Sequence, residues 1–137
     1  MKKLGISVII FALYGCTKDP LIGTWCESLD QGETCFGYET FTESEKVISK
    51  GVFPGTDVAY EMAGSYSRNG KTICLHPSQE RHIDRKTDEV IAHEPTQEMC
   101  FTVLKLSDDT LRYKLENMPE ATMYKIEKSP NRVAKGL

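Results

Sequence analysis

Residues 60–76 carry the clearest structural pattern of the chain and read YEMAGSYSRNGKTICLH. In residues 60–67, apolar and aromatic side chains largely alternate with polar ones, and this period of two is typical of a strand with one buried face. The step that follows, Asn69-Gly70, is a strong short-range signal for a tight hairpin turn. Alternation resumes in residues 71–76. The stretch therefore predicts an antiparallel β-hairpin.

The same alternation recurs on both sides of this hairpin, with turn residues between the segments. The further segments expected to be strands are 23–27, 34–42, 46–53, 98–106, 111–116 and 122–127. We expect an all-β fold, an antiparallel up-and-down meander of roughly eight strands that closes into a small barrel, because closure removes exposed strand edges. The polar stretch 77–96 is expected to be a long loop with one short strand near Val90-Ile91.

The first residues have the layout of an export signal. Met1-Lys2-Lys3 is basic, and residues 4–13 are mostly apolar. This apolar run is too short to cross a hydrocarbon layer of about 30 Å, which needs roughly 20 helical residues. The step Leu13-Tyr14-Gly15-Cys16 resembles the bacterial lipobox, in which the cysteine is acylated and becomes the first residue, although Tyr14 is bulkier than the usual occupant.

The lipobox resemblance implies that residues 1–15 are removed as a signal peptide and that Cys16 carries acyl chains such as palmitate, which anchor the protein to a membrane. Because Thr17 rather than Asp follows the cysteine, the resemblance favours the outer membrane, at its periplasmic face. An ordinary secretory signal, with Cys16 as a free thiol, is the alternative. The expected organisation is a tether at 16–20, a barrel domain at 21–128 and a flexible tail at 129–137.

Four further cysteines remain in a chain expected to reach an oxidising compartment, and an even number there predicts disulfides. Three connectivities are possible, and we favour Cys26 with Cys35 and Cys74 with Cys100, because each pair joins segments close in sequence. Zinc binding is the competing use. It is disfavoured because no C-x-x-C pair occurs and the spacings match no zinc finger or ribbon.

The charge balance argues against nucleic acid as a partner. The whole chain has 17 basic and 20 acidic residues, a formal charge of −3, and loss of Lys2 and Lys3 with the signal would make it −5. The sequence has no basic stripe, so phosphate backbones are unsuitable partners.

Leu21-Ile22-Gly23-Thr24-Trp25 resembles the opening motif of lipocalin-like domains, in which a Gly-x-Trp places an indole across the closed end of the barrel. Residues 64–67 and 122–126 also resemble small bacterial lipocalin-like lipoproteins. The chain departs from larger lipocalins because it lacks a later Thr-Asp-Tyr element. The 122 residues left after removal of residues 1–15 are also few for a roomy barrel, so an interior filled by side chains is an open alternative.

No catalytic motif is present: we find no G-x-S-x-G elbow, no H-E-x-x-H helix, no phosphate loop and no dinucleotide fingerprint, so no enzyme, catalytic residue or cofactor is expected. One polar collection contains possible divalent-metal ligands. Its members are His76, Glu80, His82, Asp84, His93 and Glu94. A solvated loop ordinarily contains such residues, and we therefore predict no metal site.

The leading functional hypothesis is a non-catalytic, membrane-anchored periplasmic protein that binds a small apolar ligand or serves an envelope role. The candidate inward-facing residues are Trp25, Phe36, Tyr38, Tyr60, Met62 and Tyr66. The alternative is a periplasmic protein-binding module, such as an inhibitor or immunity protein, that turns its acidic surface and residues 77–96 toward a basic partner. A ligand carrier requires a cavity of roughly 300 Å³ or more, so cavity size distinguishes the two.

Overall fold

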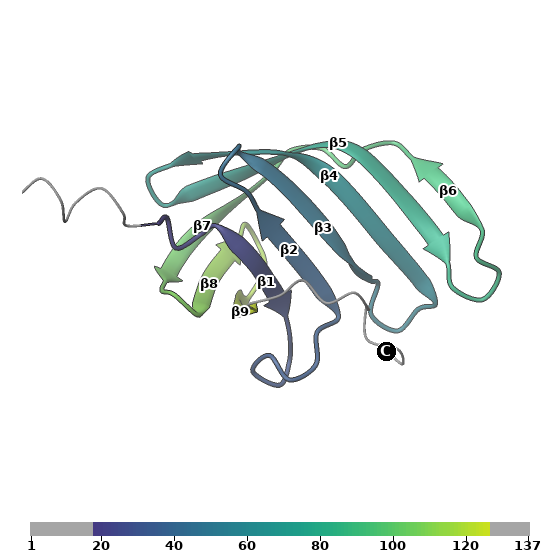
Figure 1. Ribbon diagram of the computed structural model, residues 1–137, viewed down its shortest axis with the longest axis horizontal. Helices are drawn as coiled ribbons and strands as arrows, with labels where there is room; N and C mark the ends of the chain where they lie inside the picture. Colours follow the sequence, from purple (N-terminus) through teal and green to yellow (C-terminus); the bar gives the residue numbers. More distant parts are fainter. Residues whose placement is uncertain (1–17, 127–137) are drawn as a thin grey trace, which may run out of the picture.

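The computed structural model describes residues 18–126, which form nine β-strands (Figure 1). The strands are β1 (Gly23–Glu27), β2 (Gly37–Phe41), β3 (Lys46–Val52), β4 (Val58–Asn69), β5 (Thr72–Asp84), β6 (Val90–His93), β7 (Met99–Leu106), β8 (Thr110–Leu115) and β9 (Glu120–Ile126). Eight of them follow one another in the order β1-β2-β3-β4-β5-β7-β8-β9, and β9 pairs with β1 to close the barrel. All of these pairings are antiparallel. The expected closed antiparallel meander is confirmed.

The longest hairpin joins β4 to β5 at the Asn-Gly step. Gly70 has a φ of +61°, in the left-handed region that glycine adopts without steric cost. Along the hairpin the register shifts between Ala63 and Gly64, where a β-bulge occurs. A side chain at position 64 would collide with the backbone carbonyl of His76, so the bulge requires glycine there.

The predicted loop over residues 77–96 is wrong for most of its length. β5 continues to Asp84, and its second half pairs with β6, so only residues 85–89 and 94–98 are connections. In Figure 1 these parts of β4, β5 and β6 extend past the body of the barrel. All four residues of β6 are exposed, so no buried face leaves an alternating apolar pattern in the sequence. The short strand expected near Val90-Ile91 is present as β6.

The hydrophobic core fills the barrel around the start of β1. The fully buried indole of Trp25 donates a hydrogen bond from Nε1 to the carbonyl of Leu21 at 2.8 Å. Lys125 Nζ lies over the same ring, 5.0 Å from its centre, and donates to the Pro20 carbonyl at 2.7 Å. The core cluster consists of Leu21, Trp25, Phe41, Val47, Met62, Tyr66, Ile73, Leu75, Phe101, Val103, Leu111 and Met123.

The structure contains the two favoured cysteine pairs. Cys26 of β1 is bonded to Cys35 in the connection before β2, and Cys74 of β5 is bonded to Cys100 of β7. The second bridge lies at a directly paired position of two neighbouring barrel strands. Each bridge therefore links segments that the fold already places side by side.

Several predictions fall outside the described residues. The signal peptide at 1–15, lipidation of Cys16 and the tail at 129–137 all belong to this group. Among residues 18–126, the structure contains no helical segment with the length and apolarity needed to cross a membrane.

Candidate functional site

The core fills only part of the barrel, and a cavity of about 320 Å³ occupies the remainder. The strand register explains why one end of the barrel is filled and the other is not. Phe41 and Val47 lie beside the start of β1, whereas the end of β1 is flanked by Gly37 and Gly51, which carry no side chain to fill the space. The lining residues are Glu27, Glu39, Ser49, Phe53, Tyr60, Met62, Leu75, Glu80, Thr96, Met99, Phe101, Tyr113 and Leu115.

Two carboxylates enter this cavity from adjacent strands. Glu27 ends β1, and Glu39 is in the middle of β2. Because side chains alternate along a strand, Glu39 shares the inner face of β2 with the buried core residue Phe41. Within residues 18–126 neither carboxyl group forms a side-chain hydrogen bond or an ion pair. Glu39 is surrounded by protein yet keeps some accessible surface, and that surface faces the cavity.

A cross-strand pair of glycines makes room for these polar groups. Gly37 and Gly51 face each other in β2 and β3. A Cβ atom on Gly37 would lie 3.0 Å from Glu27 Oε2 and 3.1 Å from the Tyr60 hydroxyl, and one on Gly51 would lie 2.8 Å from the same hydroxyl. Larger residues at either position would displace the carboxylate or the phenol, so the glycines keep this part of the barrel open.

Burial shifts the protonation of the cavity groups. Desolvation raises the pKa of Glu39 to about 8, and the charge of Glu27 adds to the effect. Burial also raises the pKa of Glu27. The hydroxyls of Tyr60 and Tyr113 have raised pKa values, first because of burial and second because of the nearby Glu27. The cavity thus holds carboxyl groups whose ionisation is suppressed and phenols that remain protonated at neutral pH.

A hydrogen-bonded network lies at the edge of the cavity formed by β5 and the 94–98 connection. Glu80 Oε2 accepts hydrogen bonds from the backbone N–H and the hydroxyl of Thr96, at 2.8 and 2.6 Å. His82 Nε2 lies 3.0 Å from Glu80 Oε1, and the ring of His82 stacks on that of His93. Burial acts to raise the pKa of Glu80, but the hydrogen bonds from Thr96 and His82 lower it overall. This network attaches the 94–98 connection to β5.

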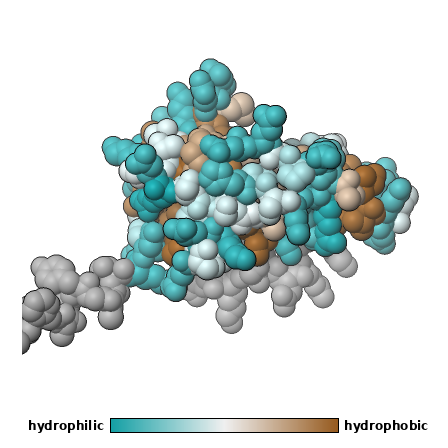
Figure 2. Space-filling model, turned by 90° about the horizontal axis from the view of Figure 1, so that it is seen from above, coloured by the Kyte–Doolittle hydropathy of each residue, from teal (hydrophilic) through white to brown (hydrophobic). Residues whose placement is uncertain are grey.

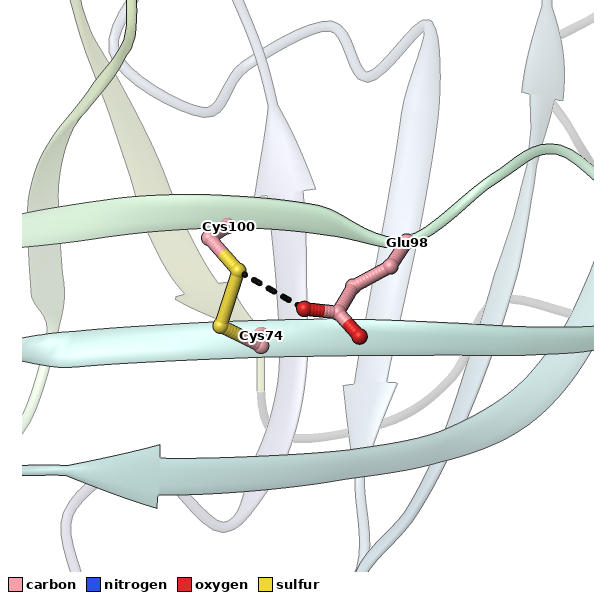
Figure 3. A group of neighbouring side chains, drawn as sticks. All are labelled: Cys74, Glu98 and Cys100. Carbon is pink, nitrogen blue, oxygen red and sulfur yellow. Dashed lines mark hydrogen bonds between the residues drawn. A yellow bond between two sulfur atoms is a disulfide. The ribbon is translucent and has the colours of Figure 1, made fainter.

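Two groups of potential metal ligands arise in the described chain. Cys74, Glu98 and Cys100 lie together (Figure 3), but both sulfurs are consumed by the disulfide, so they cannot act as thiolate ligands. Glu98 approaches this bridge with one oxygen and pairs with His76 through the other, at 3.0 Å.

The second group consists of Glu80, His82 and His93. These three residues belong to the polar collection of possible metal ligands in the sequence, together with His76, Asp84 and Glu94. The other three carry no ligand atom into the group: His76 pairs with Glu98, Asp84 binds backbone N–H groups in the β5–β6 turn, and Glu94 contacts His93 through its backbone carbonyl. Existing hydrogen bonds from Thr96 and His82 already occupy the Glu80 carboxylate.

Comparison with solved structures places this architecture in a known class. A lipocalin-like protein from Bacteroides uniformis ATCC 8492 matches with a TM-score of 0.53 and 16% sequence identity, over 79% of this chain and 100% of that chain. The fold is lipocalin-like. Compared with known protein families and with curated protein sequences, the chain gives no match. The likeness at this identity concerns the lipocalin-like architecture alone.

The six candidate ligand-binding residues occupy three different environments in the lipocalin-like barrel. Tyr60 and Met62 line the cavity. Trp25 and Tyr66 belong to the core at the other end of the barrel. Tyr38 does not face inward, because its neighbour Glu39 does and successive residues of a strand point to opposite faces. Phe36 precedes β2 and is not among the cavity-lining residues of the described chain.

Sequence reasoning missed the acidic side of the cavity. With Phe36 and Tyr38 taken as inward-facing, the period of two puts Glu39 on the outer face. The alternative choice, with Phe41 as the buried anchor, would have placed Glu39 inside by the same period of two. The signal was therefore present, but a buried carboxylate is the less common occupant of a barrel interior.

Proposed function

We propose that this protein is a non-catalytic, lipocalin-like binding protein that holds a small, largely apolar molecule in its barrel cavity. The observation that carries the proposal is the incomplete filling of the barrel. A volume of about 320 Å³ reaches the range of about 300–1,000 Å³ usual for small-molecule sites. Roughly half of the lining is apolar, contributed by Phe53, Met62, Leu75, Met99, Phe101 and Leu115. A few polar groups among such walls are the usual composition of a ligand pocket.

We further propose that lipid on Cys16 anchors the barrel to the periplasmic face of the outer membrane. The support is the sequence of residues 1–16, with its basic start, short apolar run and lipobox-like step. An anchored carrier would take up its ligand close to the membrane surface.

Native mass spectrometry of protein purified from envelope extracts tests the binding proposal. The wild type should retain a small molecule, whereas Leu115→Trp, which adds bulk at the cavity wall, should lose it. Leu104→Trp is the matched control, because the same substitution there falls on an exposed side chain of β7. Equal retention by all three proteins, or no retention by any, would contradict cavity binding.

The runner-up is a protein-binding module, and one feature favours it. An open groove of about 590 Å³ crosses the outer faces of β3, β4 and β5 and reaches β6. Val90 and Ile91 of β6 are each 53% exposed, and Figure 2 shows an apolar patch at the end of the molecule where β6 lies. β6 also pairs with β5 on one side only, which leaves an edge for strand addition.

Cross-linking in envelopes, with wild type and Ile91→Lys compared, would reveal a partner held at this edge.

A further inference from the structure

The charges on the cavity wall are of one sign. Glu27, Glu39 and Glu80 line it from three different strands, and its lining within residues 18–126 contains no Lys, Arg or His side chain. Glu80 is satisfied by Thr96 and His82, but Glu27 and Glu39 have no hydrogen-bond or ion-pair partner in the described chain. Within residues 18–126 these two carboxyl groups are therefore free to pair with solvent or with a bound molecule.

Aromatic rings surround the same space. Phe53 and Tyr60 pack with ring centres 5.0 Å apart, and Phe101 and Tyr113 pack at 5.2 Å. All four rings line the cavity. Aromatic faces attract cations and tolerate apolar groups, whereas they offer nothing to an anion. The cavity thus combines two unpartnered carboxyl groups with walls suited to an alkylated ammonium.

We infer that the cavity selects a small organic cation, an amine or quaternary ammonium with an apolar body, over neutral or anionic molecules of the same size. This inference rests on the proposed ligand-binding function and specifies its ligand class. The ammonium group lies beside Glu27 and Glu39, and the apolar body lies along Met99, Phe101 and Leu115. A fatty acid is disfavoured because its carboxylate would enter a cavity whose lining holds three carboxyl groups and no cationic side chain.

Cation binding is coupled to proton release. The titratable groups that line the cavity with Glu39 are Glu27 from β1, Tyr60 from β4, Glu80 from β5 and Tyr113 from β8. No cationic side chain is among the lining residues of the described chain. Because burial holds the pKa of Glu39 near 8, this carboxyl is mostly protonated at pH 7 in the empty cavity. A bound cation favours the ionised form of Glu39, because opposite charges attract. Its affinity should therefore rise with pH up to about 8 and level off above that value.

Isothermal titration with three probes of similar size tests the inference: hexyltrimethylammonium, octan-1-ol and octanoate. The protein is the full chain carrying Cys16→Ser, so that no detergent is needed to hold a lipid. Hexyltrimethylammonium bears a permanent charge, so any pH dependence of its binding originates in the protein. We expect it to bind at least tenfold more tightly than octan-1-ol at pH 8.5, with octanoate weakest. Its affinity should be more than tenfold higher at pH 8.5 than at pH 6.5.

Glu39→Gln should weaken hexyltrimethylammonium binding at pH 8.5 about tenfold and abolish most of the pH dependence, while octan-1-ol binding stays unchanged. Glu116→Gln is the control, because that glutamate is exposed outside the cavity. If octan-1-ol or octanoate binds as tightly as the cation, the charge selection is wrong and the binding function survives. If none of the probes binds, or Leu115→Trp leaves their binding unchanged, cavity binding itself fails.

Discussion

Replacing Glu39 by glutamine should stabilise the protein relative to the wild type, and this advantage should grow as the pH rises. In the unfolded chain this carboxyl ionises with the ordinary pKa of 4.5, whereas burial in the barrel raises its pKa to about 8. Below pH 4.5 both states carry the proton, so ionisation does not influence stability. Between the two values the unfolded state has lost the proton and the folded state keeps it, so the wild type loses stability as the pH rises. Above about pH 8 the carboxyl is ionised in both states, so the loss of stability no longer grows.

The magnitude follows from the width of this window. Each pH unit of difference corresponds to about 1.4 kcal/mol, so the folded state loses about 3 kcal/mol between pH 4.5 and pH 7 through this one group. That loss is a large part of the about 5–15 kcal/mol of a typical domain. Glutamine has nearly the same shape and cannot ionise. The difference in free energy of unfolding between Glu39→Gln and wild type should therefore grow by about 3 kcal/mol over the same interval.

Urea unfolding at a series of pH values measures this difference. The emission of Trp25 reports unfolding, because it is the only tryptophan and is fully buried. Glu116→Gln, an exposed glutamate, serves as the control and should follow the wild-type curve in parallel. If Glu39→Gln and wild type show the same pH dependence from pH 4.5 to 8, Glu39 does not occupy a desolvated site, and the electrostatic account of the cavity is refuted.

Three further predictions concern the core, the bridges and the anchor. Trp25→Ala should lower the free energy of unfolding by about 3–5 kcal/mol, because it empties a buried site and leaves the Leu21 carbonyl unpaired; an unchanged thermal midpoint would contradict this. Replacing Cys74 and Cys100 together by serine should cost about 2–4 kcal/mol in urea unfolding, and peptide mapping of the unreduced wild type should recover the two cysteines linked to each other. A fatty-acid analogue should label the wild type in growing cells and not Cys16→Ser, whereas equal labelling would exclude lipid at this position.

Local patterns predict most of the strands, because the information lies within a few residues. The Asn-Gly turn before Lys71 and the alternation on both sides of it predict the β4–β5 hairpin, which the structure contains. The pairing of Cys74 with Cys100 was favoured from sequence distance and is present as well. The same reasoning failed for residues 77–84. There the strand is held by pairing with β4 and β6, and its side chains are mostly polar and none is fully buried, so no apolar period marks it in the sequence.

Periodicity and turn chemistry act over neighbouring residues, so the sequence alone predicts the all-β class and the succession of hairpins. The burial of Trp25 is what the resemblance of residues 21–25 to lipocalin-like domains implies. The acidic character of the cavity depends on contacts between distant segments. Glu27 and Glu39 share a space only because the register aligns Gly37 with Gly51 and brings Tyr60 over both. A shift of one residue would turn every side chain of β2 to the other face, and the cavity would then face Tyr38 instead of Glu39. Register is a property of paired strands, and no single segment of the chain contains it.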